Sequence, residues 1–195
     1  MYFIRYFMDK EVRDNIIRIL DEGYKAIQDD DALKLRMLSD NTIHDASTKQ
    51  DNYSISVAVI MFSLHKLFSR ISFRTYPNCH MFVEKVLGLL KAMKISLEQD
   101  RMKSFDLSVK EFFSLVDRVA GKLKFYIKEV IDTAKISKGS RLYEHGVSLS
   151  KTADLLGVSA YELMSYIGKT GIADVDAPLK NTVRKRLSFT RGLFV

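Results

Sequence analysis

The chain has little cysteine and little proline, and both scarcities limit what it can be. Among its 195 residues there is 1 cysteine, Cys79, and there are 2 prolines. A single cysteine excludes an internal disulfide framework and suits a reducing compartment, so we expect a cytoplasmic protein. Few prolines, 9 glycines and long stretches of helical periodicity with little strict alternation predict an all-α protein.

Residue patterns that carry common enzymatic chemistry are also missing. The sequence has no Gly-x-x-x-x-Gly-Lys-Ser/Thr, no Gly-x-Gly-x-x-Gly and no His-Glu-x-x-His, which are the patterns that bind phosphates, dinucleotides and catalytic zinc. The 4 histidines lie far apart, and Cys79 and His80 are direct neighbours, which does not match the usual spacing of zinc ligands. We therefore expect no enzyme activity, no cofactor and no metal site.

One enzymatic pattern remains as a remote alternative. Arg74 and His80 have the Arg-x(4–6)-His spacing found in helical HEPN ribonucleases, in which both side chains lie near the scissile phosphate. Pro77 stands between them and would interrupt a continuous helix. This departure weakens the resemblance to a HEPN-like ribonuclease.

No hydrophobic run is long enough to suggest a membrane partner. The most hydrophobic stretch, residues 55–68, spans 14 residues and contains His65 and Lys66. A helix that crosses a bilayer needs about 20 predominantly apolar residues. The stretch therefore predicts a central core helix over residues 54–71.

Positive charge is concentrated in the later part of the chain. The formal net charge is +7, and residues 135–195 carry 10 Lys and Arg against 5 Asp and Glu, whereas residues 1–60 carry 8 against 11. A basic field attracts a polyanion over a long range, and salt weakens this attraction. Charge alone is thus compatible with a nucleic-acid partner.

Residues 1–136 predict a helical bundle that serves in dimerisation, sensing or partner binding. Apolar residues recur at helical spacing over residues 9–28, 32–45, 77–99 and 108–136, in addition to the core helix. Polar residues 47–53 predict a loop, and Ser108 with Glu111 predicts a capping box at the start of the last helix. Residues 137–140, which include Gly139, then form the best candidate for a domain boundary.

Residues 137–172 predict a helix-turn-helix module, in which a short lead helix over 141–145 comes before the two main helices. Ala153 stands four places before Gly157, so a small side chain lies where the second helix crosses and a glycine can take the positive φ of the turn. Ser159 and Glu162 then have the spacing of a capping box that opens the second helix.

The second of these helices would be the recognition helix. Its N-terminal part faces a major groove in such modules, and none of the side chains there is an arginine, asparagine or glutamine suited to bidentate reading of a base. Glu162 adds a negative charge. The predicted contacts are Ser159, Ala160, Tyr161, Met164 and Ser165, with Lys169 at the far end of the helix.

Residues 173–195 predict a linker followed by a basic terminal helix. Its cations alternate with apolar residues such as Leu187 and Phe189. Such a helix can pack its apolar face on the body or on a second subunit, or it can lay its cations along phosphates, and both interpretations stay open. The predicted phosphate contacts are Arg184, Lys185 and Arg186.

Residues 141–172 carry a pattern of motif residues: Leu142, Tyr143, Glu144, Gly146, Ser148, Leu149, Ala153, Leu156, Gly157 and Ser159, followed by Gly171 and Ile172. This pattern resembles small prokaryotic antitoxin-like proteins. The resemblance covers about one-sixth of the chain and implies an intracellular regulator whose helix-turn-helix binds its own promoter or serves as a platform for a protein partner. Those relatives are much shorter, so the N-terminal part must add another role.

These observations together predict a transcriptional regulator that binds double-stranded DNA as a homodimer, because one recognition helix alone gives limited affinity. The alternative is a non-enzymatic helical module that binds a protein and uses the helix-turn-helix only structurally. Burial of Tyr161, Met164 and Ser165 in the folded chain would favour that alternative, because no surface would then face a groove.

Overall fold

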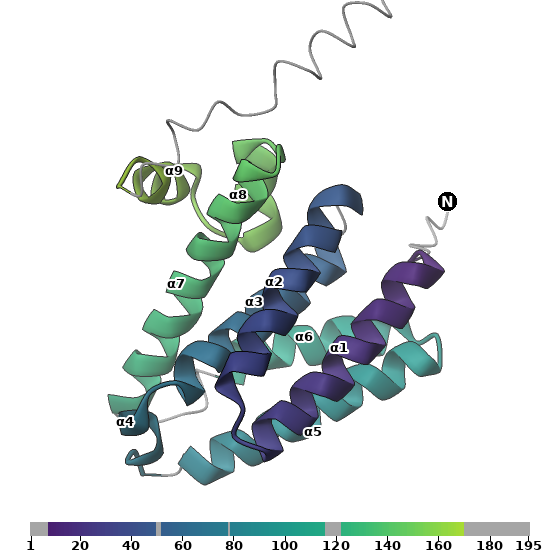
Figure 1. The fold of residues 1–195 in the computed structure, drawn as a ribbon, viewed down its shortest axis with the longest axis vertical. Coiled ribbons are helices and arrows are strands. Elements are labelled where there is room, and N and C mark those ends of the chain that lie inside the picture. Colours follow the sequence, from purple (N-terminus) through teal and green to yellow (C-terminus); the bar gives the residue numbers. More distant parts are fainter. Residues whose placement is uncertain (1–7, 50–51, 78, 116–121, 170–195) are drawn as a thin grey trace, which may run out of the picture. The chain divides into compact units, whose positions relative to one another are not determined.

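The computed structural model describes residues 8–49, 52–77, 79–115 and 122–169, and these residues are helical or lie in short connections, without a strand (Figure 1). The all-α prediction is confirmed for this part of the chain. The helices are α1 (Lys10–Gln28), α2 (Ala32–Lys49), α3 (Asn52–Phe68), α4 (Ile71–Arg74), α5 (Cys79–Glu98), α6 (Met102–Ser114), α7 (Lys122–Glu144), α8 (Leu149–Leu156) and α9 (Ala160–Lys169).

The chain divides into two compact units, residues 1–134 and residues 135–195, which we call the N-terminal and the C-terminal unit. Helix α7 contributes residues to both of them. No helix of the described residues is both long and apolar enough to cross a membrane.

Helix α1 illustrates how the sequence makes the helices of the N-terminal unit. The Asp9 carboxylate accepts the backbone N–H of Glu11 at 2.8 Å and so satisfies a donor that the first helical turn leaves unpaired. Val12, Ile16 and Ile19 then recur at helical spacing and are buried, as predicted from the sequence.

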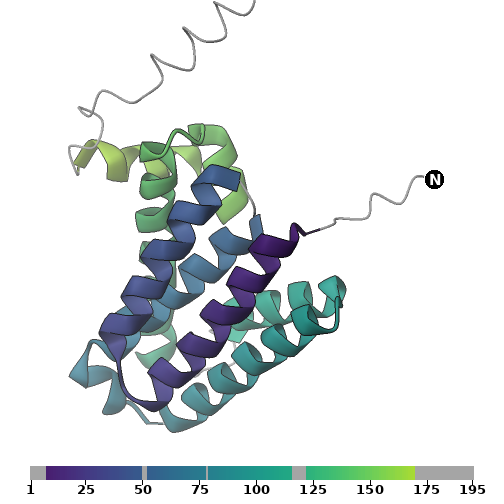
Figure 2. The ribbon, with the colours of Figure 1, turned by 45° about the vertical axis from the view of Figure 1, so that its right-hand side comes forward.

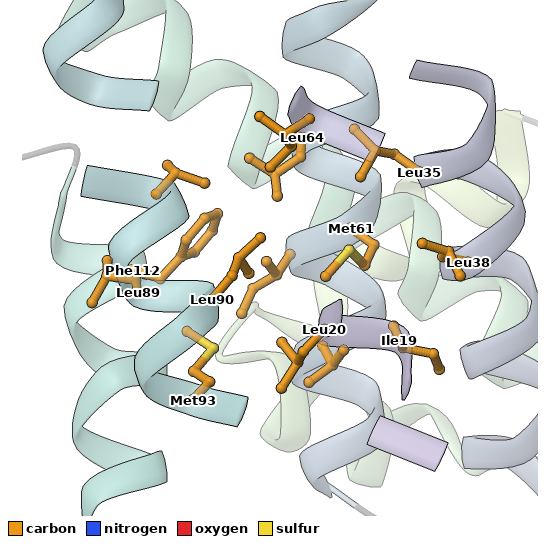
Figure 3. Packing of buried hydrophobic residues seen from close by; sticks show 14 of the residues in the cluster. Ile19, Leu20, Leu35, Leu38, Met61, Leu64, Leu89, Leu90, Met93 and Phe112 are labelled. Carbon is orange, nitrogen blue, oxygen red and sulfur yellow. The ribbon is translucent and has the colours of Figure 1, made fainter. Parts of the chain in front are cut away.

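The core of the N-terminal unit is formed mainly by α1, α2, α3, α5 and α6, and Phe73 of α4 and residues 127–131 of α7 also contribute to it. Helix α2 runs along α3, α1 packs on both of them and on α5, and α6 packs on α5 (Figures 1 and 2). Most of α3 is buried, which confirms the predicted core helix although it ends at Phe68 rather than at residue 71. Figure 3 shows side chains from these helices that point toward one another, among them Ile19, Leu20, Leu35, Leu38, Met61, Leu64, Leu89, Leu90, Met93 and Phe112.

Three predicted features of this unit are wrong. Residues 47–49 and 52–53 belong to α2 and α3 and not to a loop. Ser108 does not cap a helix but lies inside α6, where its hydroxyl donates to the Ser104 carbonyl at 3.0 Å. Phe105 and Phe112 are buried two turns apart, so their burial favours a helix that begins before Ser108. The predicted single helix over 108–136 is accordingly two helices, α6 and α7.

The domain boundary predicted at residues 137–140 lies close to the division between the two units, which falls between residues 134 and 135. The helix is not interrupted there, because residues 137–140 lie within α7, and the expected lead helix over 141–145 falls mostly within the last turn of α7. The packing around Gly139 explains why a glycine occurs within this helix. A Cβ at this position would lie 2.8 Å from Leu156 Cδ1 and 2.9 Å from Leu163 Cδ1. The missing side chain therefore lets α7 approach both α8 and α9, and this gain in packing outweighs the poor helix propensity of glycine.

Candidate nucleic-acid interface

Helix α8 begins and ends on local signals that the sequence carries. The Ser148 hydroxyl accepts the backbone N–H of Lys151 at 3.4 Å, a long N-cap hydrogen bond. Gly157 ends the helix in the left-handed region with φ of 62°, a conformation that costs a residue with a Cβ more than it costs glycine. The positive φ predicted for Gly157 is confirmed.

Helix α9 opens with the predicted capping box. The Ser159 hydroxyl accepts the backbone N–H of Glu162 at 3.1 Å and donates to the Glu162 carboxylate at 2.7 Å. The same carboxylate accepts the backbone N–H of Ser159 at 3.0 Å. The hydrogen bonds that this carboxylate accepts lower the pKa of Glu162, and the bond from the Ser159 hydroxyl has the larger effect. The negative charge that seemed to oppose DNA binding is therefore part of the helix cap.

One face of α9 is apolar and packed. Leu163 and Ile167 are buried, as are Ala153 and Leu156 of the preceding helix. Helices α8 and α9 contact each other, and the space left free by Gly139 lets the third helix, α7, close on the same leucines. Three helices thus share one small apolar centre in the C-terminal unit.

The opposite face of α9 is open, and we call it the outer face of α9: Ala160, Tyr161, Met164, Ser165 and Lys169. Tyr161 is 83% exposed and Met164 is 50% exposed. Ser165 is half-buried, whereas Ala160 and Lys169 are exposed, as is Ser159 in the cap. The burial that would have excluded a groove-facing surface is therefore not seen at Tyr161 or Met164.

The C-terminal unit carries charged side chains on this face and outside it. Lys151 and Lys169 are exposed on α8 and α9, and Arg141 of α7 lies 3.7 Å from Glu144 in an ion pair. The remaining predicted contacts, Arg184, Lys185 and Arg186, lie outside the described residues, as does the predicted terminal helix.

The residues of the remote enzymatic alternative lie on different helices. Arg74 ends α4 and donates to the Asp30 carboxylate, whereas His80 is exposed in the first turn of α5. Pro77 stands between the two helices, so the helix predicted over 77–99 begins at Cys79 and not at Pro77. Within the described residues there is also no group of three His, Cys, Asp or Glu placed to hold a metal ion.

Sequence reasoning missed one hollow of about 170 Å³ between α1 and α5. Its acidic side chain, Asp21, is already paired, at 2.7 Å with Lys25 and also with Lys94. Hydrogen bonds from these two lysines lower the pKa of Asp21. The pattern of alternating charge on α1 could have suggested the contact with Lys25, but Lys94 is 73 residues away in sequence.

Comparison of the chain with known protein families, curated proteins and solved structures finds no match. The resemblance of residues 141–172 to antitoxin-like proteins stays a prediction.

Proposed function

We propose that α8 and α9 form a helix-turn-helix that binds double-stranded DNA, and that the protein is a DNA-binding regulator. The observation that carries this proposal is the two-sided character of α9. Leu163 and Ile167 hold the helix on the unit, whereas Tyr161 and Met164 stand in solvent. A recognition helix needs this division, because one face must be fixed while the other enters a groove.

The charge of the C-terminal unit supports the same function. Lysine and arginine outnumber aspartate and glutamate by 10 to 5 over residues 135–195, and Lys151 of α8 and Lys169 of α9 are exposed. Phosphate contacts from such cations position a module on DNA and give most of the nonspecific affinity. We also propose that the protein acts as a dimer, since two recognition helices on neighbouring half-sites multiply affinity and specificity.

The alternative function, a protein-interaction module, has one specific observation in its favour. Leu33 and Met37 lie one turn apart on α2 and are 70% and 60% exposed. Exposed apolar side chains at this spacing are typical of a helix that meets a partner. A protein that binds through α2 need not bind DNA, so a DNA titration distinguishes the two functions.

The test is fluorescence anisotropy of the full chain with a labelled duplex that carries the DNA upstream of its gene, and with a scrambled duplex of the same composition. Tyr161→Ala should weaken binding to the upstream duplex about tenfold, because a specific contact contributes roughly 1–3 kcal/mol. The matched control is Phe125→Ala, which removes a 74% exposed aromatic side chain of the N-terminal unit and should leave affinity unchanged. Absence of duplex binding would refute the proposal in favour of the interaction module.

The contribution of the basic segment is tested separately. Replacement of Arg184, Lys185 and Arg186 by alanine should weaken binding to both duplexes alike and reduce the slope of log affinity against log salt by up to about three. An unchanged slope would remove these cations from the interface.

A further inference from the structure

The outer face of α9 has little capacity to read bases by hydrogen bonds. Its polar groups are the hydroxyls of Tyr161 and Ser165 and the ammonium of Lys169. The side chains that read bases in a bidentate manner are arginine or lysine for guanine and asparagine or glutamine for adenine. Lys169 stands in the last turn of the helix, away from the N-terminal part that would enter a groove first.

Glu162 does not supply the missing hydrogen bonds to bases. A glutamate in a recognition helix can accept a hydrogen bond from the amino group of cytosine. Here the carboxylate already accepts the Ser159 hydroxyl at 2.7 Å and the Ser159 backbone N–H at 3.0 Å. If it turned to a base, α9 would lose its cap.

Apolar surface dominates what remains on this face. The Met164 side chain, the Tyr161 ring and the Ala160 methyl group stand on adjacent turns, and all three residues are exposed. In the major groove, the apolar group that distinguishes one natural base from the others is the C5 methyl of thymine. A methyl at the same ring position also occurs on 5-methylcytosine.

We propose that α9 recognises duplex DNA through the C5 methyl groups of thymine, packed against Tyr161 and Met164. This inference rests on the proposed function, because it assumes that α9 enters the major groove. The excess of lysine and arginine in residues 135–195 matches the charge of DNA, so a duplex fits this apolar face better than an uncharged partner does.

The test uses four labelled duplexes and the full chain: alternating A·T, the same duplex with deoxyuridine for thymidine, alternating G·C, and G·C with every cytosine 5-methylated. Deoxyuridine removes the methyl and leaves the hydrogen-bonding edges unchanged. Each buried methyl should contribute about fourfold in affinity. Two contacts therefore predict that affinity falls roughly fifteenfold when deoxyuridine replaces thymidine. Affinity for the G·C duplex should rise when its cytosines are methylated.

Protein variants assign the effect to α9. Tyr161→Ala with Met164→Ala should abolish the difference between the thymidine and deoxyuridine duplexes, and circular dichroism checks that this exposed double variant stays helical. Lys169→Ala should weaken both duplexes equally and keep their ratio. Equal affinity of the wild-type chain for thymidine and deoxyuridine duplexes would overturn methyl recognition while DNA binding stands. Failure to bind any of the four duplexes would overturn the proposed function as well.

Discussion

Gly139 is the residue whose replacement tests the packing of the C-terminal unit most directly. In Gly139→Ala, the new methyl group would lie 2.8 Å and 2.9 Å from terminal carbons of Leu156 and Leu163, and 3.4 Å from Thr152 Cγ2. Alanine in a helix gains roughly 0.8–1.0 kcal/mol over glycine, whereas overpacking of a filled core costs typically about 1–3 kcal/mol. Because both leucines are buried, we expect a net loss of about 1 kcal/mol.

The matched control is Gly88→Ala in α5. A Cβ at Gly88 meets nothing within 4 Å, and the residue is exposed in the middle of a helix. This variant should therefore show the helix-propensity gain alone, about 1 kcal/mol of stabilisation. The two substitutions are chemically identical, so their opposite signs isolate the effect of the close approach.

Hydrogen exchange measured by mass spectrometry is the suitable assay, because two units need not unfold in one step. Peptides from α8 and α9 should exchange about fivefold faster in Gly139→Ala, which corresponds to about 1 kcal/mol, whereas peptides from α5 should exchange more slowly in Gly88→Ala. If Gly139→Ala slows the exchange of α8 and α9, then α7 does not approach these helices as closely as described, and the reasoning is refuted.

Three further substitutions or measurements probe other groups. Thr152→Val should stabilise the chain to urea by about 1 kcal/mol, because the buried Thr152 hydroxyl has no hydrogen-bond partner among the residues that the structure describes. Thr42→Val should not stabilise it, because the Thr42 hydroxyl donates at 2.6 Å to a backbone carbonyl. The pKa of Glu162 lies below its ordinary value of 4.5, so its charged cap should stabilise α9 fully above pH 4.5 and lose this effect as the pH falls through the lowered pKa. The urea midpoints of Glu162→Gln and of the wild type should therefore differ at pH 7 and converge in acid. A difference that stays constant with pH would contradict this. Burial raises the pKa of the Cys79 thiol, so a thiol reagent at pH 8 should label it more slowly in the folded chain than in urea, and equal rates would show that Cys79 is accessible.

The prediction of the candidate site succeeded where the signals were local. The capping hydrogen bonds of the Ser159–Glu162 pair join residues three positions apart, and the turn at Gly157 depends on its own φ. Periodicity likewise predicted which residues of α1 face the core. Whether the outer face of α9 is exposed could not be predicted, because the same residues would suit a buried helix just as well.

The prediction failed where local signals competed with contacts distant in sequence. Ser108 and Glu111 have the pattern of a cap, yet burial of Phe105 and Phe112 favours a helix that includes the turn before them. Residues 137–140 have a linker-like composition and lie close to the division between the two units, but they continue α7 because Gly139 is buried against residues of α8 and α9.

From the sequence alone, the helical class, the glycine turn that ends α8, the cap of α9 and the positively charged C-terminal segment could be deduced, since each depends on residue type or on neighbours within one turn. Only the tertiary structure decided that α7 continues through Gly139 and that α9 buries Leu163 while it exposes Tyr161. The physical reason is that close packing between residues far apart in sequence stabilises the core, and this stabilisation can outweigh the local preference of any single residue.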